Sequence, residues 1–129
     1  MVSFSMKTGA QMPEEVVDAA VLAMKDLLLR DLGDEIVSII FFGSRSSGYF
    51  TPDSDIDVLI IVKRRDHHVV NRIFEIADTV ELNLLSYRFS FSLHIRSEQE
   101  HLRFKKIKSP FTSEVEREGK IVYARETQS

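Results

Sequence analysis

The sequence has no cysteine and no tryptophan, and it has only 5 glycines and 3 prolines in 129 residues. The lack of cysteine excludes a disulfide scaffold, an iron–sulfur cluster, a thiolate zinc site and a cysteine nucleophile. Any catalytic chemistry must therefore use oxygen or nitrogen groups, or a hard metal ion.

Long apolar runs are also missing. The longest, at residues 56–62, contains Asp57 and is far shorter than the roughly 20 residues that span a bilayer. Lys7 is not followed by the apolar segment and cleavage site of a secretory signal. We therefore expect a soluble, cytoplasmic protein with no membrane partner. With 43% apolar and 29% charged residues, we expect one globular domain over residues 1–129, its core at about 13–124.

The net charge of −3 conceals an uneven distribution of charge along the chain. Residues 1–87 carry 8 Lys/Arg and 14 Asp/Glu, whereas residues 88–129 carry 9 and 6. The basic part contains a cluster formed by Arg103, Lys105, Lys106 and Lys108. A solvated helix face is the default interpretation of this cluster, and contact with an acidic protein partner or an RNA acceptor is the alternative.

The spacing of apolar residues predicts an α/β (α+β) fold in which helices back a mixed β-sheet. Helices are predicted at about residues 13–32, 66–78, 97–106 and 112–118, the third of them starting at a capping box. Strands are predicted at residues 36–42, 55–62, 80–85 and 121–124. Residues 86–96 stay open, because their apolar residues alternate as in a strand while their serines and histidine fit a loop equally well.

Two aspartates at the start of the second predicted strand carry the clearest chemical signal. Asp55 and Asp57 are two residues apart, so a strand places both carboxylates on one face. Two adjacent negative charges are tolerated when a cation lies between them. Mg²⁺ or Mn²⁺ fits such oxygen ligands and binds substrate phosphates as well. The pair therefore predicts a substrate that contains phosphate.

A turn at the end of the preceding predicted strand fits the same substrate. Gly43 lets the backbone approach a phosphate closely, and Ser44 adds a hydroxyl beside the backbone N–H groups. Arg45 would add a charge-assisted contact to the phosphates, or would instead form a structural pair with Asp53. Gly43, Ser44 and Arg45 are therefore the candidate nucleotide-binding residues.

Two-metal phosphoryl transfer usually needs a third acidic group. Glu81, on the predicted strand 80–85, is our candidate, with Asp78 as the weaker choice and an exposed strand carboxylate as the alternative interpretation. We do not expect His67 and His68 to bind one metal ion together, because adjacent residues on a helix point about 100° apart. We expect these two histidines at a solvated helix start.

The motifs Gly-Ser-Arg-x-x-Gly at residues 43–48 and Ser-Asp-Ile-Asp-Val-Leu-Ile at residues 54–60 resemble the minimal nucleotidyltransferases of the DNA polymerase beta superfamily. Residues 109–123 also resemble the short helix and closing strand of many such proteins. The resemblance implies an NTP, expected to be ATP, held by the Gly-Ser turn, and Mg²⁺ held by the two aspartates. The third carboxylate falls on Glu81, where the family usually has aspartate.

The resemblance also implies a reaction and a partner. Members transfer a nucleoside monophosphate to a hydroxyl and release pyrophosphate, and minimal members commonly accompany a helical partner of the HEPN class in toxin–antitoxin pairs. We therefore expect AMP transfer to a macromolecular hydroxyl, on a HEPN-type toxin. The alternatives are an antitoxin that acts by contact alone and a transferase for small molecules such as aminoglycosides. The presence of both Asp55 and Asp57 favours the enzyme.

Overall fold

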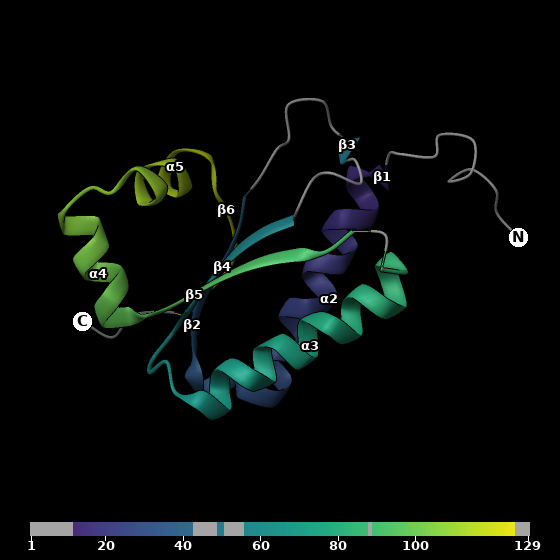
Figure 1. Cartoon of the computed structure of the whole chain (residues 1–129), viewed down its shortest axis with the longest axis horizontal. Helices are drawn as coiled ribbons and strands as arrows, with labels where there is room; N and C mark the ends of the chain where they lie inside the picture. Colours follow the sequence, from purple (N-terminus) through teal and green to yellow (C-terminus); the bar gives the residue numbers. More distant parts are fainter. Residues whose placement is uncertain (1–11, 43–48, 51–55, 88, 126–129) are drawn as a thin grey trace, which may run out of the picture.

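The computed structural model describes residues 12–42, 49–50, 56–87 and 89–125 (Figure 1). Its centre is a four-stranded mixed sheet with the strand order β5-β4-β2-β6. The strands are β2 (Ile36–Phe42), β4 (Ile56–Val62), β5 (Phe91–Ser97) and β6 (Lys120–Ala124). Strand β2 is antiparallel to β4 and β6, whereas β4 and β5 are parallel. The predicted mixed sheet is therefore confirmed.

Helices cover both faces of this sheet (Figure 1). Helices α2 (Glu14–Leu32) and α3 (His67–Leu85) lie against one face, and α4 (Glu98–Lys106) and α5 (Pro110–Glu118) lie on the other side. A 3₁₀ turn, η1 (Gly33–Glu35), links α2 to β2, and two short strands, β1 (Met12–Pro13) and β3 (Tyr49–Phe50), pair with each other. Among the described residues, no helix is long and apolar enough to span a membrane.

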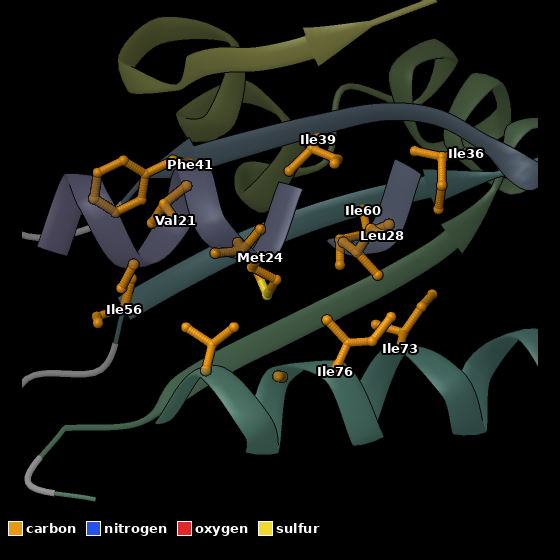
Figure 2. Packing of buried hydrophobic residues seen from close by; sticks show 14 of the residues in the cluster. Val21, Met24, Leu28, Ile36, Ile39, Phe41, Ile56, Ile60, Ile73 and Ile76 are labelled. Atoms are coloured by element: carbon orange, nitrogen blue, oxygen red, sulfur yellow. The ribbon is translucent and has the colours of Figure 1, made fainter. Parts of the chain in front are cut away.

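The main hydrophobic core lies between the sheet and the α2–α3 pair (Figure 2). Alternate residues of β4 face this core, and Ile56 and Ile60 are fully buried there. They meet side chains that recur at helical spacing on α2, such as Met24 and Leu28, which are also fully buried. Burial of each such side chain contributes about 1.5–3 kcal/mol to the free energy of folding. Together these side chains hold the sheet against helices α2 and α3.

Residues 80–85, predicted as a strand, are the last part of α3, so that prediction is wrong. The helix begins at its N-cap Asp66 and keeps a helical pattern of buried residues through Val80. It ends where Ser86 and Tyr87 adopt positive φ angles of 51° and 58°. A short apolar run fits a strand and a buried helix segment equally well, and here the helical continuation buries Val80 and Leu85.

The missing strand is β5, which lies within the stretch that the sequence left open. It pairs in parallel with β4 along its whole length, from Ile56 opposite Phe91 to Val62 opposite Ser97. Helix α4 follows at once, and its predicted capping box at Ser97 and Glu100 is confirmed. The predicted short helix and closing strand are α5 and β6, so the order of elements after β5 is also confirmed.

Candidate functional site

Strands β2 and β4 bring the two predicted motifs to one end of the sheet. They are antiparallel, and Phe42, the last residue of β2, lies opposite Asp57, the second residue of β4. The chain therefore leaves β2 toward Gly43 at the same end at which it enters β4 after Asp55. Gly43, Ser44, Arg45 and Asp55 lie outside the described residues, as does Asp53, so their predicted roles stay predictions.

Asp57 projects from the sheet face that α4 and α5 cover. The alternate residues Leu59 and Ile61 pack with Phe42 and Val115 of α5, on the side away from the main core. The side chain of Asp57 keeps 30% of its surface exposed. Solvent therefore reaches this carboxylate.

His94 of β5 lies beside Asp57. Its Nε2 is 3.7 Å from the Asp57 Oδ1, and 38% of its side-chain surface is exposed. The His94 ring packs against Phe111, with ring centroids 4.7 Å apart, and against Phe42, at 5.7 Å. Our sequence interpretation missed this residue, because the strand that carries it was left open; the alternation of residues 89–95 was the signal that could have found it.

Arg96 continues the row of polar side chains along β5. Its guanidinium lies over the rings of Phe104 and Phe111, 4.0 and 4.8 Å from their centroids, and donates a 3.0 Å hydrogen bond to the buried Thr112 Oγ1. Burial lowers the pKa of Arg96 from its ordinary value, opposed by the charge of Glu100. These contacts tie α4 and α5 to the sheet, which holds Phe111 against His94.

Glu81 is on α3 and not on a strand, which corrects the position we expected for it. Its Oε2 accepts a 2.7 Å hydrogen bond from the backbone N–H of Phe91, the first residue of β5. Helix α3 lies against the sheet face opposite the one from which Asp57 projects. The described contact gives Glu81 a structural role at the start of β5. The weaker candidate, Asp78, is also on α3 and accepts a hydrogen bond from the Tyr87 hydroxyl at 3.2 Å.

The donor atoms at this end of the sheet suit a divalent cation. Asp57 supplies carboxylate oxygen, the preferred ligand of Mg²⁺ and Mn²⁺, and His94 supplies an imidazole nitrogen. Within the described ranges, no group of three or more His, Cys, Asp or Glu residues is arranged to hold a metal ion. His67 and His68 are exposed at the start of α3, as expected for a solvated helix end.

The predicted basic cluster lies on α4 and just after it. Its four members are exposed: Arg103, Lys105, Lys106 and Lys108. Lys105 forms a 3.8 Å ion pair with Glu116 of α5. Exposure is expected both of a solvated helix face and of a surface that contacts an acidic partner or an RNA, so both interpretations stay predictions.

Comparisons with known proteins agree with this architecture. The model of the family described as "Polymerase beta, Nucleotidyltransferase" matches residues 23–128. The chain is also similar to the solved structure of a mutant toxin–antitoxin complex, MntA-HpeT, at 21% identity, with 77% of this chain and 68% of that chain covered and a TM-score of 0.44. No curated protein sequence matches the chain. Because the family model spans the whole sheet and Asp57, the chain belongs to the polymerase beta nucleotidyltransferase family.

Proposed function

We propose that this chain is an active nucleotidyltransferase that transfers AMP from ATP to a hydroxyl group of a macromolecular acceptor. Asp55 and Asp57 would hold Mg²⁺ or Mn²⁺, and Gly43, Ser44 and Arg45 would bind the triphosphate. The acceptor that we propose is a helical toxin of the HEPN type, because the motifs resemble those of minimal nucleotidyltransferases, which commonly accompany such toxins. Membership of the polymerase beta nucleotidyltransferase family supports nucleotidyl transfer as the general chemistry.

The observation that carries the proposal is the pairing of Phe42 with Asp57. In this register Phe42, which directly precedes the Gly-Ser motif in sequence, lies opposite Asp57 of the Asp-x-Asp motif at one end of the sheet. A phosphate-binding turn and a metal-binding carboxylate can act on one triphosphate only when they lie near each other, so this strand pairing supports the proposal. The Asp57 side chain is also 30% exposed, so solvent reaches the carboxylate, as a ligand for a dissolved metal ion requires.

The proposed reaction is a displacement at the α-phosphorus. An acceptor hydroxyl oxygen forms a bond to that phosphorus, the bond from the phosphorus to the β-phosphate oxygen breaks, and the hydroxyl proton is released with pyrophosphate as the leaving group. When bound, the divalent ion would neutralise charge on the phosphates. Asp57 would hold that ion at the end of the sheet at which β4 begins, where pairing of β4 with β2 and β5 fixes the position of the carboxylate.

The test is transfer of label from α-³²P-ATP to a purified HEPN-type protein encoded beside this chain, in Mg²⁺ and in Mn²⁺. Asp57→Asn removes the charge but keeps the shape of the side chain, and we expect it to reduce label transfer about 100-fold or more. Asp26→Asn is the matched control, because Asp26 lies on α2, 73% exposed, away from the site. This control is expected to label the partner like the wild type.

Three other outcomes would contradict the proposal. Equal labelling by wild type and Asp57→Asn would place the chemistry elsewhere. Absence of labelling with all four NTPs, together with tight binding of the partner by both proteins, would identify an antitoxin that acts by contact. Labelling of a small molecule such as an aminoglycoside, and not of the protein, would contradict the macromolecular acceptor.

A further inference from the structure

Strand β5 lies parallel to β4 beside Asp57, yet none of its seven residues is acidic. Ser92 is directly opposite Asp57, and His94 is the next β5 residue on the same face. The carboxylate that we expected to complete the site, Glu81, belongs to α3, which packs against the other face of the sheet, and it accepts a hydrogen bond from the first residue of β5. The nearest metal-binding side chain to Asp57 on this strand is therefore an imidazole.

The spacing between His94 and Asp57 suits two ligands of one ion. Their facing atoms, Nε2 and Oδ1, are 3.7 Å apart, beyond the range of a direct N–H···O hydrogen bond. Two ligand atoms, each about 2.1 Å from the same metal ion, lie about 3.0–3.4 Å apart for octahedral or tetrahedral angles. A side-chain movement of a few tenths of an ångström would therefore bring both atoms into the coordination sphere of one ion.

The environment of His94 also favours ligation. The ring contacts Phe42 and Phe111, whose own rings meet edge to face with centroids 5.3 Å apart. Packing between these rings limits the rotamers of His94, so that little side-chain entropy remains to be lost on binding. Both His94 and Asp57 are about one-third exposed, which gives an ion access to them.

We propose that His94 is a metal ligand together with Asp57, and that this nitrogen makes the site favour a transition-metal ion such as Mn²⁺ over Mg²⁺. The proposal rests on the proposed function, because it concerns the same metal site. Mg²⁺ binds oxygen ligands almost exclusively. Mn²⁺ also binds oxygen ligands, but as a first-row transition metal it accepts an imidazole nitrogen more readily than Mg²⁺ does. Ligation by His94 therefore predicts a preference that two carboxylates alone would not give.

The experiment is a Mn²⁺ titration of the full chain, followed by the loss of the electron paramagnetic resonance signal of free Mn²⁺. Pulsed measurements on the bound ion then detect nitrogen coupling. We expect imidazole coupling in the wild type, with a frequency that changes when histidine is labelled with ¹⁵N. His94→Gln should abolish this coupling and weaken Mn²⁺ binding about tenfold or more, while Mg²⁺ binding, measured by competition, changes less.

The matched control is His68→Gln, because His68 is exposed at the start of α3. It should bind Mn²⁺ like the wild type and retain the coupling. Absence of coupling in the wild type overturns the proposal without any variant, and so does a His94→Gln affinity within about twofold of the wild type. If Asp57→Asn loses Mn²⁺ while His94→Gln does not, the proposed site stands and the role of His94 falls. If Asp57→Asn binds Mn²⁺ normally, or the wild type binds none, the proposed function falls too.

Discussion

The two faces of the four-stranded sheet differ in what covers them. The face under α2 and α3 packs into a continuous apolar cluster, in which Met24, Ile39 and Ile60 have no exposed surface. The face under α4 and α5 has a smaller buried cluster of four residues, and beside it lie the partly exposed side chains of Asp57 and His94. Polar groups therefore gather on the face that is covered least.

This difference follows from the helices that each face receives. Helices α2 and α3 each present an apolar stripe along 19 residues, whereas α4 has 9 residues and none of them is buried. Helix α4 is held through Arg96, whose guanidinium lies between Phe104 and Phe111. One face thus supplies most of the hydrophobic stabilisation, and the other can leave charged groups accessible to ligands.

The largest effect on stability is expected from a cavity in the core between the sheet and helices α2 and α3. Ile60→Ala removes a fully buried side chain between the sheet and the two long helices, and we expect it to lower the free energy of unfolding by about 2–5 kcal/mol in urea titrations. The control is Ile121→Ala, at a β6 residue that is 67% exposed, with an expected change within about 0.5 kcal/mol. Equal losses for the two variants would contradict the assignment of the main core to this face.

A smaller loss is expected on the opposite face, at Gly119 between α5 and β6. A Cβ atom there would lie 2.4 Å from the Val115 carbonyl oxygen and 2.7 Å from Ile40 Cγ2, so Gly119→Ala must displace backbone. We expect this overpacking to cost about 1–3 kcal/mol of unfolding free energy. Gly33→Ala is the matched control, since nothing lies within 4 Å of a Cβ atom there. A Gly33→Ala variant destabilised as much as Gly119→Ala would contradict the close approach of α5 to β2.

The same contrast decides how much could be predicted from the sequence. The sheet face under α2 and α3 was predictable, because fully buried strands and long amphipathic helices carry strong periodic signals. The capping box at Ser97 was predictable as well, because its sequence pattern is local. The predictions failed around residues 80–96. There an apolar run continues a helix, and a strand with one half-buried face alternates apolar residues with serine, histidine and arginine.

That failure explains the errors at the candidate site. Asp57 was predicted correctly as a strand residue, since its motif does not depend on the third strand. Glu81 was placed on a strand because the end of α3 was taken for one, and His94 was missed because β5 was not assigned. The partner strand of Asp57 is set by tertiary pairing between β4 and β5, which no local pattern in either segment encodes.

The two sides of the molecule are expected to respond differently to acid, because different titratable groups contribute to the stability of each side. On the α2–α3 side, hydrogen bonds from Arg72 lower the pKa of Asp31 from its ordinary value of 3.8. A carboxyl whose pKa is lower in the folded state contributes stability above its ordinary pKa, and loses that contribution only as the pH falls below it. This ion pair therefore stays formed at all pH values well above 4, and mild acid leaves it unchanged.

On the α4–α5 side, burial lowers the pKa of His101 from its ordinary value of 6.5, helped by the positive charges of Lys105 and Arg96 and opposed by Glu116. Because the folded state disfavours the proton, the contribution of neutral His101 is present above pH 6.5 and is lost as the pH falls through that range. We therefore expect urea midpoints of the wild type to fall between about pH 7.5 and about pH 5.5, and His101→Gln to show a smaller fall. His68→Gln, which changes an exposed histidine on α3, should fall as the wild type does. If His101→Gln and the wild type lose stability equally over this range, the acid sensitivity does not arise from the partial burial of His101 on α4.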